Sequence, residues 1–219
     1  MNRKQAVIFD LDGTLIDNRA SFAKAYQVLC ARHPELYAPD DRKTEEWLVR
    51  FYRSYNTPRK DECYRALSER LAPRTLPSQT ELIDEWGMIY ANNAVRLPDA
   101  IDTLEYLKAR GYRLGLLTNG DSERQWAKIH SSELFPYFDH ITVSGDCPFA
   151  KPDPAIYRIS LEGLGITADQ ALFVGDTPST DIDGARNAGI DSLWLTGGTE
   201  NTVGATYIAP SVSYLKEIL

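Results

Sequence analysis

The chain has 219 residues, with 24 basic and 31 acidic side chains and a formal charge of −7. This length allows one large domain, or a main domain with a smaller inserted one, and either can bury a sizeable core. The acidic charge repels nucleic acid and anionic membranes, and no apolar run approaches the roughly 20 residues needed to span a bilayer. We therefore expect a globular cytoplasmic protein, a monomer or dimer, with no nucleic-acid partner and no membrane partner.

Three cysteines, Cys30, Cys63 and Cys147, are odd in number and lack the C-x-x-C spacing. A disulfide framework or a zinc site is therefore not expected. The three thiols are predicted to be reduced and mostly buried.

Five short apolar runs predict buried strands. They cover residues 5–9, 113–118, 140–144, 171–174 and 192–195. Helical patterns separate them, as at residues 100–110, where Asp99 is the expected N-cap and Gly111 the expected terminator. Strands that alternate with helices indicate an α/β fold, with a mostly parallel sheet covered by helices on both faces.

Residues 19–96 break this alternation, because their apolar side chains fall at helical spacings. The three groups are Phe22, Tyr26 and Leu29; Leu48, Phe51, Tyr52 and Tyr55; and Leu82, Trp86 and Tyr90. We predict an inserted all-helical subdomain at 19–96 and a main domain formed by 1–18 and 97–219. The insert has 13 basic and 11 acidic side chains, a net charge of +2, and the rest has 11 basic and 20 acidic, a net charge of −9. If the insert closes over the main domain, its basic residues suit an anionic substrate; alternatively, they are ordinary solvated faces.

Polar side chains follow several predicted strands at the point where each strand ends. These are Asp10 and Asp12, Thr118 and Asn119, Lys151, and Asp176 and Asp181. A single acid at such a position is often a helix cap or a turn residue. Four such sites on one sheet edge favour a ligand site instead, because ligands of open α/β sheets sit beyond the carboxyl ends of the strands.

Asp10 can act as a nucleophile without a general base, because a carboxylate is already ionised at neutral pH. Its natural target is the phosphorus of a phosphate ester. That substrate is itself an anion, so Asp10, Asp176 and Asp181 would repel it unless a hard cation intervened. Mg²⁺ prefers oxygen ligands and commonly bridges carboxylates to a substrate phosphate, so we expect a magnesium site here.

The remaining polar residues have complementary roles in such a reaction. Lys151 would supply a further positive charge, while the Thr118 hydroxyl and the Asn119 backbone N–H would hold phosphoryl oxygens. Asp12 could protonate the leaving alcohol and then activate the water that breaks the aspartyl phosphate. Gly13 would let the chain turn away sharply after the second acid.

These residues resemble the four motifs of the haloacid dehalogenase superfamily of phosphohydrolases. "DLDGT" holds Asp10 and Asp12, "LLTN" holds Thr118, "KPDP" holds Lys151, and "GDTPSTD" holds Asp176 and Asp181. All four motifs occur in order and span essentially the whole chain. The resemblance implies a Rossmann-like three-layer α/β/α core, an aspartyl-phosphate intermediate on Asp10, and a helical cap inserted after the first motif. It also implies a bound Mg²⁺ whose ligands are Asp10, the main-chain carbonyl of Asp12, Asp176 and, directly or through water, Asp181.

The resemblance implies a magnesium-dependent phosphatase that hydrolyses a small phosphorylated metabolite. A dehalogenase needs neither a leaving-group acid nor a metal, so Asp12, Asp176 and Asp181 argue against it. A phosphomutase of the same superfamily and a non-catalytic phosphometabolite-binding protein stay open as alternatives. The family's substrates include phosphoglycolate, sugar phosphates and nucleoside monophosphates, and the sequence does not select among them.

Some residues of the insert are candidates for contact with a substrate. They are Arg50, Arg53, Arg59 and Lys60, mixed with Phe51, Tyr52 and Tyr55. The basic side chains could bind a second anionic group, and the aromatic ones could stack on a base or a sugar. We expect the aromatic side chains to form the insert's own core instead.

Overall fold

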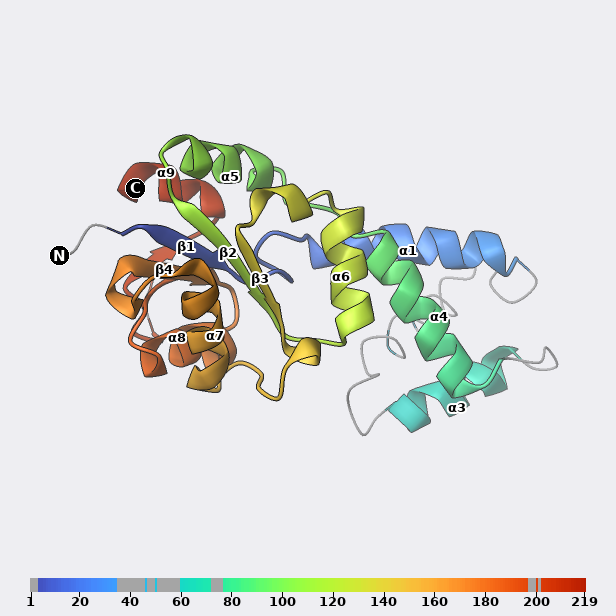
Figure 1. Cartoon of the computed structure of the whole chain (residues 1–219). Coiled ribbons are helices and arrows are strands. Elements are labelled where there is room, and N and C mark those ends of the chain that lie inside the picture. The colour runs from blue at the N-terminus through green and yellow to red at the C-terminus, as the bar shows by residue number, and fades with distance from the viewer. Residues whose placement is uncertain are drawn as a thin grey trace. The chain divides into compact units, whose positions relative to one another are not determined.

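The computed structural model describes residues 4–34, 46, 50, 60–71, 77–196, 200 and 202–219 (Figure 1). Contacts within the chain divide it into two compact units. The core unit comprises Met1–Asn18 and Ala94–Leu219, and the helical insert comprises Arg19–Asn93.

A six-stranded parallel sheet forms the centre of the core unit, in the order β3-β2-β1-β4-β5-β6. The strands are β1 (Ala6–Phe9), β2 (Arg113–Thr118), β3 (His140–Val143), β4 (Ala171–Gly175), β5 (Asp191–Leu195) and β6 (Tyr207–Ala209). β1 lies inside the sheet between β2 and β4, so a residue that directly follows β1 is placed at the middle of the sheet edge.

Alternating side chains of the strands pack into two separate cores. In β1, Val7 and Phe9 belong to one core, and Ala6 and Ile8 belong to the other. The first core includes side chains of α5 (Ala100–Ala109), α6 (Ser122–Ser131) and α9 (Leu215–Ile218). The second includes side chains of α7 (Pro154–Leu164) and α8 (Asp183–Asn187). Figure 1 shows α5 and α9 on one side of the sheet and α7 and α8 on the other, which confirms the predicted α/β/α fold.

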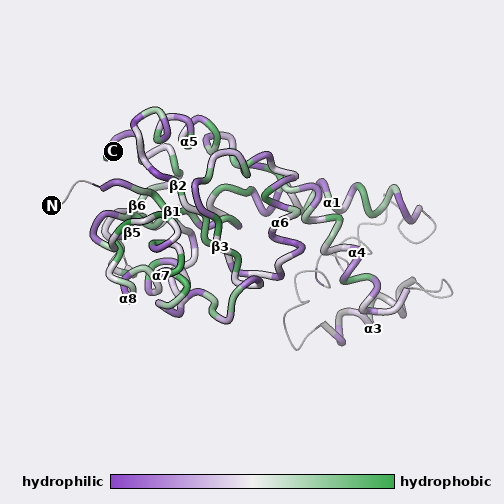
Figure 2. Tube along the Cα trace, viewed as in Figure 1, coloured by the Kyte–Doolittle hydropathy of each residue, from purple (hydrophilic) through white to green (hydrophobic). Residues whose placement is uncertain are grey.

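Figure 2 shows the hydrophobic colouring concentrated on the strands of this sheet. All four residues of β1 are fully buried, as a central strand with helices on both faces requires. Five strands match the five apolar runs of the sequence to within one residue at each end. The sixth, β6, was not predicted, because three residues are too few to give a pattern.

The predicted helix at residues 100–110 is α5, and its ends follow the expected signals in part. Gly111 has a φ of +82°, so it ends the helix with the left-handed backbone that glycine favours. Asp99 occupies the N-cap position but makes no side-chain hydrogen bond to the helix. Its carboxylate instead accepts a hydrogen bond from the backbone N–H of Ser213 at 3.2 Å, so the predicted capping contact is wrong.

The segments that lead into and out of the insert lie next to each other in space. The backbone N–H of Asp17 donates to the carbonyl of Val95 at 2.8 Å, and that of Leu97 donates to the carbonyl of Leu15 at 2.9 Å. These two hydrogen bonds hold the outgoing and returning segments side by side. A sequence of about 75 residues can therefore be inserted at little cost to the sheet, because its two ends are already close together.

Three helices are described in the insert: α1 (Asn18–Arg32), α3 (Lys60–Leu71) and α4 (Gln79–Asn92). Two of the three predicted apolar groups contribute to one small core, in which the rings of Phe22 and Trp86 have their centroids 4.7 Å apart. The third group, residues 48–55, lies outside the described residues except for Arg50. α4 begins with a capping box in which Ser78 and Glu81 exchange hydrogen bonds.

The cysteines with described side chains carry free thiols, as predicted. Cys30 is buried in the insert and Cys147 is half-buried. Within the described part of the chain, no helix is both long and apolar enough to cross a membrane.

Candidate active site

The loop after β1 places Asp10 at the centre of the sheet edge. The Asp10 backbone N–H donates to the carbonyl of Val174 at 2.9 Å, so pairing with β4 continues one residue past β1. Thr14 donates its hydroxyl hydrogen to Asp10 Oδ2 at 3.2 Å. Asp10 is only 6 % exposed. A carboxylate so shielded from water needs hydrogen-bond and charge partners within the protein.

Gly13 turns the chain in this loop with a φ of +89°. A Cβ atom at this position would overlap the carboxylate of Asp176. Glycine is therefore required at this position for two reasons, its backbone conformation and the close approach of Asp176.

Lys151 is the main partner of Asp10. Its ammonium lies 2.5 Å from Asp10 Oδ1 and 2.8 Å from Asp181 Oδ1, and its side chain is 3 % exposed. The side-chain amide of Asn119 fixes the backbone of Lys151, because it accepts from the Lys151 N–H at 2.8 Å and donates to the Lys151 carbonyl at 2.9 Å. A residue at the end of β2 thus positions the loop that carries the lysine.

Asp176 and Asp181 come from the segment that follows β4. Asp176 directly follows the strand, and Asp181 lies on a single π-helical turn, Pro178–Ile182. The backbone N–H of Thr177 donates to Asp181 Oδ2 at 2.9 Å, and the Thr177 hydroxyl donates to Asp176 Oδ1 at 3.0 Å. π-turns are rare and are frequent at functional sites. One oxygen each from Asp10, Asp176 and Asp181 lies within 4.8 Å of the other two.

The pKa values at the site reflect burial together with crowded negative charge. Burial raises the pKa of Asp10 to about 7; Lys151 opposes this rise and Asp181 adds to it. Burial alone would lower the pKa of Lys151, but Asp10 and Asp181 outweigh it, so the pKa is raised and the amine stays charged. Burial also raises the pKa of Asp176. Three carboxylates share one ammonium, and negative charge remains in excess.

This donor set fits a divalent cation. With all three acids ionised and Lys151 charged, the group carries two uncompensated negative charges in a largely buried position. All available ligand atoms are oxygens, which hard cations such as Mg²⁺ prefer. Burial raises the pKa of Asp10 and the neighbouring Asp181 adds to the rise, and a bound dication would act against both by favouring the ionised carboxylate.

Two side chains of α6 contact the carboxylate of Asp12. The Lys128 ammonium lies 2.8 Å from Asp12 Oδ1 and 2.7 Å from Asp12 Oδ2. Gln125 Nε2 lies 3.1 Å from Asp12 Oδ2, 2.6 Å from Thr118 Oγ1 and 2.9 Å from the carbonyl of Asn119. Gln125 therefore links the loop after β1 to the end of β2.

The structure brings most of the predicted site residues together. One cluster contains Asp10, Lys151, Asp176 and Asp181. Asn119 contacts this cluster through the backbone of Lys151. Gln125 contacts both Asp12 and Thr118. The sequence analysis missed Gln125 and Lys128. Their three-residue spacing puts both on one face of a helix that directly follows the "LLTN" segment, and this is the signal that could have found them.

Comparison with known proteins gives the family. Residues 4–189 match the sequence model of the haloacid dehalogenase-like hydrolases, so the chain belongs to this family. A glyceraldehyde 3-phosphate phosphatase of Pyrococcus furiosus is 28% identical over 229 residues, which cover 100% of this chain and 94% of the relative. The human N-acylneuraminate-9-phosphatase is 29% identical over 210 residues, covering 89% of this chain and 84% of the relative.

A solved structure shows the same fold. It is the HAD-hydrolase YfnB from Bacillus subtilis bound to magnesium, with a TM-score of 0.79 and 24% sequence identity over 100% of this chain and 99% of that one. The resemblance to the haloacid dehalogenase superfamily is therefore confirmed, as is the α/β fold. The predicted enzyme class, a phosphoric monoester hydrolase, agrees with the relatives that are named phosphatases.

Proposed function

We propose that the chain is a magnesium-dependent phosphatase that hydrolyses a small phosphorylated metabolite through a phosphoryl group carried on Asp10. One observation carries the proposal: Asp10 is buried within reach of two further carboxylates, while the ammonium of Lys151 lies 2.5 Å from its Oδ1. Burying several carboxylates together costs folding free energy unless their charge is balanced. The arrangement therefore favours a site that binds a cation and an anionic substrate.

Asp10 is held in a fixed orientation for attack on phosphorus. Lys151 contacts one carboxylate oxygen and the Thr14 hydroxyl contacts the other. In the reaction a carboxylate oxygen of Asp10 forms the new bond to phosphorus as the bond to the ester oxygen breaks. Water then cleaves the aspartyl phosphate and restores the carboxylate.

Asp10, Asp176, Asp181 and the main-chain carbonyl of Asp12 are the proposed ligands of Mg²⁺. When bound, the ion neutralises the charge of the phosphoryl group and of the surrounding carboxylates. YfnB, a protein with the same fold, is bound to magnesium in its crystal structure, which supports the choice of ion. Lys151 adds a positive charge that does not depend on the ion.

Thr118, the Asn119 backbone N–H and Lys151 are the proposed phosphate-binding groups. Gln125 Nε2 also faces oxygens of Asp12 and Asn119, so this atom is the amide donor and Thr118 Oγ1 accepts from it at 2.6 Å. The hydroxyl hydrogen of Thr118 is therefore directed elsewhere and is available to a phosphoryl oxygen. Preorganised donors of this kind stabilise charge that develops during the transfer.

Asp12 is the proposed general acid and base. It would donate a proton to the leaving oxygen and later accept one from the attacking water. Lys128 and Gln125 determine where its carboxylate lies before substrate binds.

Residues 19–96 are the proposed helical cap domain, and residues 1–18 and 97–219 are the proposed catalytic core, as the family resemblance implies. The names of two relatives, a glyceraldehyde 3-phosphate phosphatase and an N-acylneuraminate-9-phosphatase, support a phosphorylated metabolite as the substrate class. The candidate substrate contacts Arg53 and Arg59, and the aromatic residues Phe51, Tyr52 and Tyr55 that we expect in the insert's core, lie outside the described residues.

The test is hydrolysis of p-nitrophenyl phosphate by the full chain. We expect turnover that EDTA abolishes and added Mg²⁺ restores, and no turnover above background for Asp10→Asn. A panel of phosphometabolites, assayed for released inorganic phosphate, then ranks substrates by kcat/KM. Conversion of a sugar phosphate to an isomer without phosphate release would indicate a phosphomutase, and saturable binding without turnover would indicate a binding protein.

A further inference from the structure

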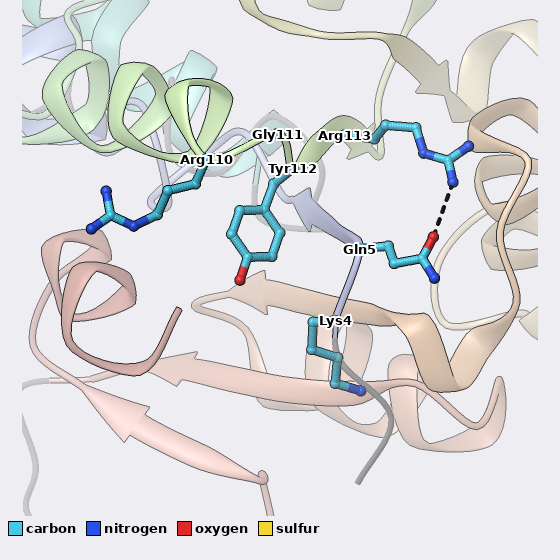
Figure 3. Close-up of a pocket in the computed structure, with 6 residues that line it drawn as sticks. All are labelled: Lys4, Gln5, Arg110, Gly111, Tyr112 and Arg113. Atoms are coloured by element: carbon cyan, nitrogen blue, oxygen red, sulfur yellow. Dashed lines mark hydrogen bonds between the residues drawn. The ribbon is translucent and has the colours of Figure 1, made fainter.

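A pocket of about 440 Å³ opens at the amino ends of β1 and β2. Its lining residues are Lys4, Gln5, Arg110, Gly111, Tyr112 and Arg113 (Figure 3). Three of these six residues are basic and none is acidic. We infer that this pocket is a second ligand site of the core unit and binds a small molecule that bears a phosphate dianion.

The pocket lies at the opposite end of the strands from the candidate active site. Gln5 directly precedes β1, and Asp10 directly follows it. Arg113 is the first residue of β2, and Thr118 is the last. Five residues of extended chain at about 3.3 Å each put Gln5 about 16 Å from Asp10. A ligand in this pocket therefore does not touch the catalytic residues, and the inference stands apart from the proposed reaction.

Arg113 contributes a fixed positive charge that contacts the C-terminal carbonyls of α7 and no carboxylate among the described residues. Its guanidinium donates to the carbonyls of Leu164 and Gly165, the latter at 3.3 Å, and to Gln5 Oε1 at 3.5 Å, the bond drawn in Figure 3. These acceptors are neutral. In the part of the chain that the structure describes, no carboxylate lies within 4.0 Å of this guanidinium.

Arg110 contributes a second charge without an acidic partner among the described residues. It is exposed, and its guanidinium carbon lies 3.8 Å from the centre of the Tyr106 ring. Figure 3 shows Arg110 and Arg113 extending to opposite sides of Tyr112. Since Arg113 is held by three acceptors and Arg110 rests on a ring face, ligand binding requires Arg110 to rotate toward the pocket.

Lys4 differs from the two arginines because its charge is already balanced. Its ammonium lies 2.7 Å from Asp191 Oδ2 and 2.9 Å from the carbonyl of Asp169. Two arginines of the pocket thus have no carboxylate partner among the described residues, which suits a phosphate dianion better than a single carboxylate. Guanidinium groups also present paired N–H donors with the spacing of phosphate oxygens.

The surroundings make this charge unusual. Residues 1–18 and 97–219 together have a net charge of −9, so two cations without a carboxylate partner beside a hollow are not an average solvated surface. Gly111 leaves the opening clear, because nothing lies within 4 Å of where its Cβ would be. The site can therefore admit a small anion without movement of the backbone.

The experiment is a titration of the isotope-labelled full chain with inorganic phosphate in EDTA, followed through backbone amide resonances. We expect saturable shifts at Gln5, Gly111 and Arg113. Arg110→Gln should weaken phosphate binding at least about tenfold, since a hydrogen bond to a charged group is lost. Arg158→Gln, which removes the same charge from an exposed position on α7, should leave binding unchanged.

Two results would overturn the inference. One is a set of shifts confined to the other sheet edge, around Thr118. The other is equal phosphate affinity for Arg110→Gln and Arg158→Gln. Arg110 makes no backbone contact through its side chain in the described structure, so its replacement should not impair folding. Because the titration measures binding without Mg²⁺, its outcome is independent of whether the chain hydrolyses phosphate esters.

Discussion

The Lys128 ammonium forms an ion pair with the Asp12 carboxylate, at 2.7 and 2.8 Å, across 116 positions of sequence. The pair joins α6 to the loop after β1. Lys128 is 12 % exposed at its side chain and Asp12 is 29 % exposed, so the contact is partly shielded from water. It fixes the carboxylate that the proposed reaction uses for proton transfer.

We expect Lys128→Met to lower the rate for alkyl phosphates about tenfold more than the rate for p-nitrophenyl phosphate. A positioned general acid contributes roughly 100- to 10,000-fold, and only a poor leaving group needs its proton. The measurement is kcat for both substrates. Lys108→Met, at an exposed lysine that contacts Tyr137 and Asp139, is the control and should leave the ratio unchanged. An equal loss on both substrates would assign Lys128 a structural role only.

Gly13→Ala should damage the magnesium site more than the fold. Both Gly13 and Gly111 have positive φ, so alanine costs about 1 kcal/mol of strain at either position. Only at Gly13 would the new methyl group displace the Asp176 carboxylate, since Gly111 faces open space. We predict similar losses of unfolding free energy for the two variants. The concentration of Mg²⁺ needed for half-maximal activity should rise only for Gly13→Ala, and an unchanged value would contradict this.

Stabilisation of the protein by Mg²⁺ should increase with pH. The pKa of Asp10 is raised by burial from 3.8 to about 7, so its protonation stabilises the metal-free fold at low pH, and this contribution is lost as pH rises through about 7. A dication binds the ionised form and competes with the proton. The rise in Tm on adding Mg²⁺ should therefore be larger at about pH 8 than at about pH 6. Asp10→Asn should remove most of this difference; a rise that is equal at both pH values in the unmodified protein would refute the prediction.

His140 should make the fold sensitive to mild acid. Burial lowers its pKa from 6.5, and its Nε2 is buried without a hydrogen-bond partner among the described residues. The unfolded chain thus binds a proton more readily, so this histidine's contribution to stability is present above pH 6.5 and is lost as pH falls below that value and through the lowered pKa of the folded protein.

His140→Gln should reduce this loss. The measurement is the free energy of unfolding in urea at about pH 7.5 and about pH 5.5, where an ordinary histidine changes charge. We expect a smaller difference between the two pH values for the variant. His130→Gln, at an exposed histidine on α6, is the control, and equal differences for both variants would contradict a specific effect of His140.

The sequence predicts the sheet well because its strands are buried on both faces. Short runs of mainly apolar residues, such as residues 113–118, mark such strands. The sequence did not predict β6, because only one of its three residues is buried and the run is too short to form a pattern. The Asp99 cap failed because Ser213, distant in sequence, offers the carboxylate a better donor.

The sequence likewise predicts some residues of the candidate site and misses others. Asp10 and Asp176 directly follow β1 and β4, and a parallel sheet brings such ends together, so their convergence follows from order along the chain. Lys151 lies in the longer loop between β3 and α7, so its contact with Asp10 does not follow from the strand pattern alone. Gln125 and Lys128 lie within a polar helix whose side chains resemble a solvated face until the packing of α6 is known. The roles of all these residues stay predictions that the variants above test.

Phosphoryl transfer to Asp10 is the step that a single measurement tests most directly. The full chain is mixed with Mg²⁺ and a substrate that carries radioactive phosphorus, quenched in acid within one turnover, and digested for peptide mapping. Label on the peptide that contains Asp10, and none on Asp10→Asn, is the predicted result. Hydrolysis at the unmodified rate by Asp10→Asn, or label on a different residue, would contradict the mechanism.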